Sequence, residues 1–61
     1  MFRVGDVVRI TTIKSKHFNE LGKVIRVLQN NLGEYRFAVT FGKRGRPPFF
    51  IKSELEKAHY E

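Results

Sequence analysis

Large side chains at every second position near the middle of the chain constrain its fold more than any other feature. These side chains belong to Tyr35, Phe37, Val39 and Phe41. Successive side chains of an extended backbone point to opposite faces, so a spacing of two places all four on the same face. We therefore predict a half-buried β-strand over residues 35–41.

The segments on either side have the composition of further short strands. Residues 7–13 are β-branched at almost every position, which disfavours a helix and favours a strand. Apolar residues dominate segments 23–28 and 49–51, where we expect two more strands. Residues 14–21 are polar and without periodicity, which predicts a long loop that ends at Gly22.

Turn signals connect these strands and close the chain. Two Asn and a Gly within residues 30–33 accept the left-handed backbone of a tight turn and predict a hairpin there. Ser53 and Glu56 have the Ser-x-x-Glu spacing of a capping box, in which each side chain bonds the backbone of the other residue. This pattern predicts a short helix that begins at Ser53 and runs toward His59.

Chain length and cysteine content limit the architecture. The 61 residues include no cysteine, so packing alone must hold one core, and we expect a single domain over residues 1–61. Several short strands in so small a chain favour a closed sheet, because closure removes exposed edges. The predicted fold is all-β, a small SH3-like barrel of four or five short strands with a short C-terminal helical turn.

The chain is strongly basic. Twelve Lys and Arg against six Asp and Glu give a net charge of +6, and six of the twelve are Arg, which binds planar carboxylates and phosphates well. Such a positive field attracts nucleic acid, acidic proteins and anionic lipid headgroups, although excess Lys also serves solubility alone. The side chains that we expect to contact the partner are Lys14, Lys16, Lys43, Arg44 and Arg46.

Two features of the sequence are compatible with binding to nucleic acid. The tetrapeptide Arg44-Gly45-Arg46-Pro47 looks like the core of an AT-hook, and such an arm can enter the narrow minor groove of A/T-rich DNA. Phe49 and Phe50 are adjacent, so in a strand they face opposite ways and one of them can be exposed to stack on a base. The alternative for that ring is to pack beneath the C-terminal turn against Leu55.

Catalytic and metal-binding patterns are missing from the sequence. Ser15 and Ser53 stand in no nucleophile motif, and His17 and His59 lack metal-ligand spacing. His17 follows Lys16 in a basic loop, where we expect a solvated side chain instead of a general base. We predict no enzyme, metal, cofactor or small-molecule substrate. No apolar run approaches the roughly 20 residues of a membrane span, and the first residues do not read as a signal peptide.

Motifs spread over most of the chain resemble a known group of small barrels. The motifs are Gly5-x-x-Val8-Arg9-Ile10, Phe18-Asn19-Glu20-Leu21-Gly22-x-Val24, Tyr35-x-x-x-Val39-x-Phe41 and Ser53-Glu54-Leu55-Glu56. They are similar to SH3-like electron-transport accessory proteins of oxygenic photosynthesis, namely photosystem I reaction-centre subunit IV and the ferredoxin-docking subunit S of the NDH-1 complex. The resemblance implies a barrel on the cytoplasmic or stromal side of a thylakoid complex, where basic residues dock acidic ferredoxin.

We therefore expect a non-enzymatic docking module that binds an acidic protein, such as ferredoxin, at a larger complex. Binding through a rim of charges should show mainly in the association rate and its salt dependence. Two alternatives stay open. One is a nucleic-acid-binding module, either KOW-like on RNA or through the Arg-rich loop on DNA, and the other is a structural subunit whose basic face anchors it to an assembly.

Overall fold

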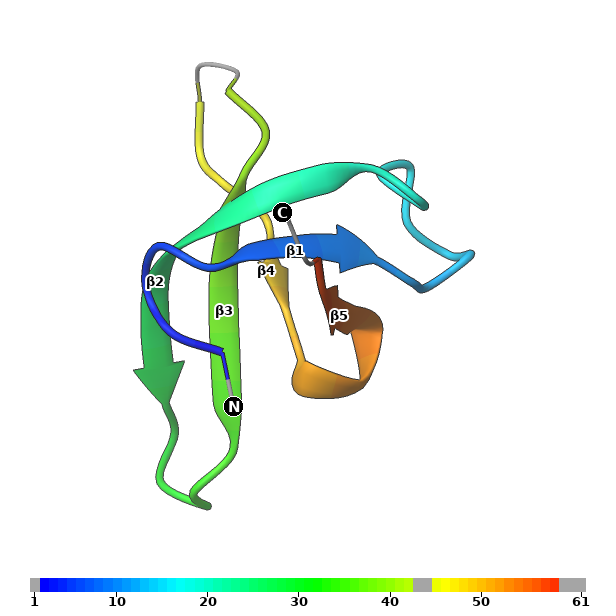
Figure 1. The fold of residues 1–61 in the computed structure, drawn as a ribbon. Coiled ribbons are helices and arrows are strands. Elements are labelled where there is room, and N and C mark those ends of the chain that lie inside the picture. Colours follow the sequence, from blue (N-terminus) through cyan, green and yellow to red (C-terminus); the bar gives the residue numbers. More distant parts are fainter. Residues whose placement is uncertain (1, 43–44, 59–61) are drawn as a thin grey trace.

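One antiparallel sheet makes up most of the molecule. The computed structural model describes residues 2–42 and 45–58, and within them five strands are ordered β4-β3-β2-β1-β5 (Figure 1). The elements are β1 (Val7–Ile10), β2 (Leu21–Gln29), β3 (Tyr35–Thr40), β4 (Phe49–Phe50), the 3₁₀ helix η1 (Lys52–Glu54) and β5 (Leu55–Lys57). The all-β prediction is confirmed, and the assignment to the SH3-like barrel class stays a prediction.

Strand β2 joins the two halves of the sheet. Its first residues pair with β1, and the rest of its length pairs with β3. The pairing register shifts between Val24 and Arg26, which marks a β-bulge, and bulges bend and twist the strand that contains them. Strand β2 is accordingly curved in Figure 1, where its start runs along β1 and its end runs along β3.

Side chains from every strand form one core. Its buried members are Val8, Ile10, Val24, Phe37, Val39, Phe50 and Leu55. Phe37 and Val39 are fully buried, and the flanking rings of Tyr35 and Phe41 pack against the core while half-buried, as the alternation along β3 predicts. The ring of Phe2 contacts the ring of Phe37 edge-on, with ring centroids 5.4 Å apart.

The C-terminal prediction needs correction. The helical turn begins at Lys52, one residue early, and the chain is already extended at Leu55, where β5 begins. The Glu54 carboxylate closes this turn by accepting the Ile51 N–H at 3.1 Å, so the capping pattern between Ser53 and Glu56 is not used. Leu55 pairs with β1 and enters the core at 7% exposure, and this burial outweighs a local capping signal. His59 lies outside the described residues.

Strand boundaries differ from the sequence expectations at two places. Strand β1 ends at Ile10 instead of continuing to residue 13, and one residue further on the Thr11 N–H donates to the Glu54 carbonyl at 2.9 Å. Gly22 lies inside β2 and not at the end of a loop, and its φ is not positive. The expected close backbone packing is present there, because a Cβ on Gly22 would lie 2.4 Å from Val39 Cγ1.

Candidate binding surface

The bulge in β2 exposes two consecutive side chains. Ile25 is 43% exposed and Arg26 is exposed, whereas Val24 before them is fully buried and Val27 after them packs partly against the core. A regular strand would alternate inward and outward side chains without interruption. The extra residue of the bulge therefore lets Ile25 and Arg26 line the same outer groove.

This groove has a volume of about 360 Å³ and lies over Ala38 of β3. Its lining residues are Ile25, Arg26, Ala38, Arg46, Pro47 and Phe49. Ala38 pairs with Arg26 on one neighbouring strand and with Phe49 on the other, and its methyl group is fully buried between their larger side chains. The small residue leaves the sheet hollow at this position, and we refer to the hollow as the Ala38 groove.

A second hollow, of about 140 Å³, lies beside the β1–β2 loop. Its lining residues are Lys16, His17, Val39, Thr40, Phe41, Gly45, Arg46, Pro47 and Pro48. The His17 ring stacks on Phe41 with centroids 4.1 Å apart and an interplanar angle of 8°, and its Nδ1 lies 2.9 Å from Glu20 Oε1. The His17 side chain is only 14% exposed, so the expected solvated histidine is wrong. We refer to this hollow as the His17 cleft.

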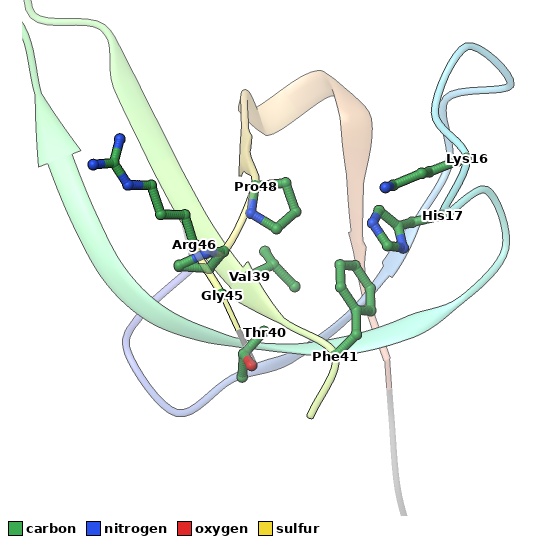
Figure 2. Close-up of a pocket in the computed structure, with 9 residues that line it drawn as sticks. Lys16, His17, Val39, Thr40, Phe41, Gly45, Arg46 and Pro48 are labelled. Carbon is green, nitrogen blue, oxygen red and sulfur yellow. The ribbon is translucent and has the colours of Figure 1, made fainter. Parts of the chain in front are cut away.

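Two predicted contact residues stand on opposite sides of the His17 cleft. Figure 2 shows Lys16 beside His17, and Arg46 across the cleft with Val39 and Pro48 between them. The guanidinium of Arg46 points away from His17. Arg46 also lines the Ala38 groove, so this residue borders both hollows.

The other predicted contact residues have different positions. Lys14 is exposed in the β1–β2 loop and lines neither hollow. Lys43 and Arg44 lie outside the described residues, as does the first position of the AT-hook-like tetrapeptide. Of the two adjacent aromatic residues, Phe49 is 44% exposed and Phe50 is 6% exposed in the core, so Phe50 offers no exposed contact.

Carboxylates are absent from β1, β2, β3 and β4, whereas basic side chains occur on both halves of the sheet. Strands β2, β3 and β4 contain Lys23, Arg26 and Arg36 but no Asp or Glu. The carboxylates of the described chain belong to loops, to the hairpin turn and to the C-terminal segment, at Asp6, Glu20, Glu34, Glu54 and Glu56. Over residues 2–42 and 45–58, the only carboxylate within 4.0 Å of a basic group pairs with His17, which leaves these Lys and Arg charges free for a partner.

Sequence reasoning missed several residues that line these hollows. Ile25, Arg26 and Ala38 were expected only as parts of strands, and His17 was expected to face solvent. A signal for the bulge exists in the sequence, since Val24, Ile25 and Val27 break the period of two that a regular half-buried strand would show. No local sequence pattern predicts that His17 stacks on Phe41, because the two residues are far apart along the chain.

In the part of the chain that the structure describes, no three or more His, Asp or Glu side chains gather in a group that could hold a metal ion. None of its helices has the length and apolarity needed to cross a membrane. The sequence matches no protein-family model and no curated protein, and the fold matches no solved structure. The two hollows and the charges around them are therefore the features that bear on the function of this protein.

Proposed function

We propose that this chain is a non-enzymatic docking module that binds an acidic protein through the basic side of its sheet. The observation that carries the proposal is that β2, β3 and β4 contain basic residues and no carboxylate. A surface of one sign accelerates the encounter with a partner of opposite sign and disfavours partners of like sign. A net charge of +6 on 61 residues extends this field over the small molecule.

The hollows between the cations favour a protein as the partner. Interface pockets are filled by partner side chains, and the residues that carry most of the binding energy cluster in them. Lys16 lies at the rim of the His17 cleft, and Arg46 lines both hollows, so an acidic side chain could meet one charge at each hollow. The sequence resemblance makes ferredoxin, docked at a larger photosynthetic complex on the cytoplasmic or stromal side, our first candidate partner.

Charge reversal tests this proposal. Arg46→Glu and Lys16→Glu should each lower the association rate with ferredoxin, by roughly tenfold at low salt, because steering depends on local charge. The control is Lys57→Glu, which makes the same charge change at an exposed residue of β5 that lines neither hollow. Stopped-flow or surface plasmon resonance measurements over a salt series should show a small effect for the control. Equal effects of all three variants would refute docking at this site.

A duplex titration separates this proposal from the DNA alternative. At about 150 mM salt, near physiological ionic strength, the docking module should bind A/T-rich and G/C-rich duplexes equally weakly. A clear preference for the A/T-rich duplex would assign the chain to minor-groove binding and overturn the docking proposal. Failure to bind ferredoxin, other acidic proteins and both duplexes would overturn it in favour of a structural subunit.

A further inference from the structure

The Ala38 groove differs from the His17 cleft in its chemistry. Ile25, Ala38, Pro47 and Phe49 make its floor and walls apolar, and Arg26 and Arg46 are its only charged lining residues. Ile25 and Phe49 are both more than two-fifths exposed, and both line this one groove. The groove therefore presents apolar surface and two guanidinium groups within one site.

We propose that the Ala38 groove receives one large apolar side chain of an acidic partner segment, whose flanking carboxylates pair with Arg26 and Arg46. The inference rests on the proposed function and specifies the partner's chemistry, an apolar anchor between acidic residues. Arginine holds a carboxylate through two parallel hydrogen bonds, so each guanidinium fixes one flanking residue. The anchor removes Ile25 and Phe49 from water, and this contribution is not screened by salt as the ion pairs are.

The size of the groove fits a side chain. Its volume of about 360 Å³ would accommodate one large side chain, and its lining includes Ala38, a small residue that pairs with Arg26 on one neighbouring strand and with Phe49 on the other. The bulge adds the second wall by exposing Ile25 next to Arg26. A partner side chain that enters the groove would thus lie across β2, β3 and β4, on the part of the sheet that contains no carboxylate.

A nucleobase would fit this groove less well. Bases have donor groups on their edges, and the six lining residues provide no side-chain acceptor, since their only polar side chains are the two arginines. Burying those donors without partners is costly, whereas an aliphatic or aromatic side chain leaves no polar group unpaired. The same two arginines satisfy carboxylates next to the anchor.

The test compares two peptides that differ at one position. Each peptide has a central residue between two Asp-Glu pairs, and the central residue is Leu in one peptide and Ser in the other. Each peptide is titrated into the protein, and the chemical shifts of the backbone amides are recorded at each step. This measurement gives the dissociation constant even when binding is weak. Burial of one leucine predicts that the Leu peptide binds about 10-fold more tightly or better, with the largest shifts near Ile25 and Ala38.

Variants locate the anchor. Ala38→Val fills the groove without changing the charge, and Ile25→Ala removes one wall, so both should reduce the affinity difference between the two peptides to about twofold or less. The control is Ile13→Ala, which truncates a similar side chain that is 81% exposed and outside the groove, and it should preserve the difference. Ile25→Ala keeps the test decisive if Ala38→Val does not fold, since Ile25 lies largely at the surface.

The outcomes separate this inference from the proposed function. Equal binding of the two peptides by the parent protein would overturn the apolar anchor and leave electrostatic docking intact. Binding of ferredoxin without binding of either peptide would also overturn the anchor alone. Failure of both peptides and of acidic proteins would overturn both proposals. Tighter binding of oligothymidylate than of the Leu peptide, with shifts at Phe49, would assign the groove to single-stranded nucleic acid instead.

Discussion

Replacement of Gly22 by alanine should weaken the fold by a calculable amount. An added Cβ would lie 2.4 Å from Val39 Cγ1, 2.8 Å from Phe41 Cε1 and 3.0 Å from the Thr40 carbonyl oxygen. Val39 is fully buried and cannot move aside, so the sheet itself must shift. Overpacking of this kind costs about 2 kcal/mol, and the reduced freedom of the unfolded chain offsets about 0.5 kcal/mol.

The net loss of about 1.5 kcal/mol should lower the melting temperature by about 6–12 °C in a domain of this size. Thermal unfolding followed by circular dichroism measures this shift. Gly42 provides the contrast, because its φ is +80° and an added Cβ would meet nothing within 4 Å. Asparagine tolerates a left-handed backbone, so Gly42→Asn should be milder than Gly42→Ala, whereas Gly22→Asn should be no milder than Gly22→Ala. A Gly22→Ala protein that melts like the parent would refute the packing argument.

Two further substitutions test the core and the His17 cleft. Phe37→Ala should lower the free energy of unfolding by roughly 3–5 kcal/mol, which is most of the stability of a domain this small. Denaturant titration should therefore show this variant largely unfolded. The control is Leu32→Ala at a turn position that is 84% exposed, and it should unfold like the parent. His17→Ala should cost about 1 kcal/mol by removing the stack on Phe41, and His17→Phe should recover most of it; equal melting of both variants would contradict a stabilising stack.

The sequence was most informative where a short period reports burial directly. Alternation from Tyr35 onward predicted the central strand, because a half-buried strand must repeat every two residues whatever its partners are. The C-terminal turn was predicted less well, since Ser53 and Glu56 form a local signal that competes with long-range pairing. Leu55 pairs with β1 and enters the core, and a local pattern contains no information about that partner.

The candidate site was harder to predict for the same reason. The basic residues could be identified from composition, and two of them, Lys16 and Arg46, line one cleft. The hollow between β2 and β4 depends on which residues become neighbours across strands, and Ala38 is informative only once Arg26 and Phe49 are known to flank it. A small residue in a strand pattern does not by itself distinguish a groove from an ordinary sheet position.

The bulge in β2 connects the stability of this fold with its candidate function. The curvature of β2 allows one strand to pair with both β1 and β3, so that side chains from all five strands meet in one core. The extra residue of the bulge is Ile25, and the register shift places its side chain beside Arg26 on the outer face. Without it, Val24 and Val27 could not both face the core, and the groove would lose either its apolar wall or its charge. The bulge therefore both lets this small sheet enclose a core and forms a groove on its basic surface.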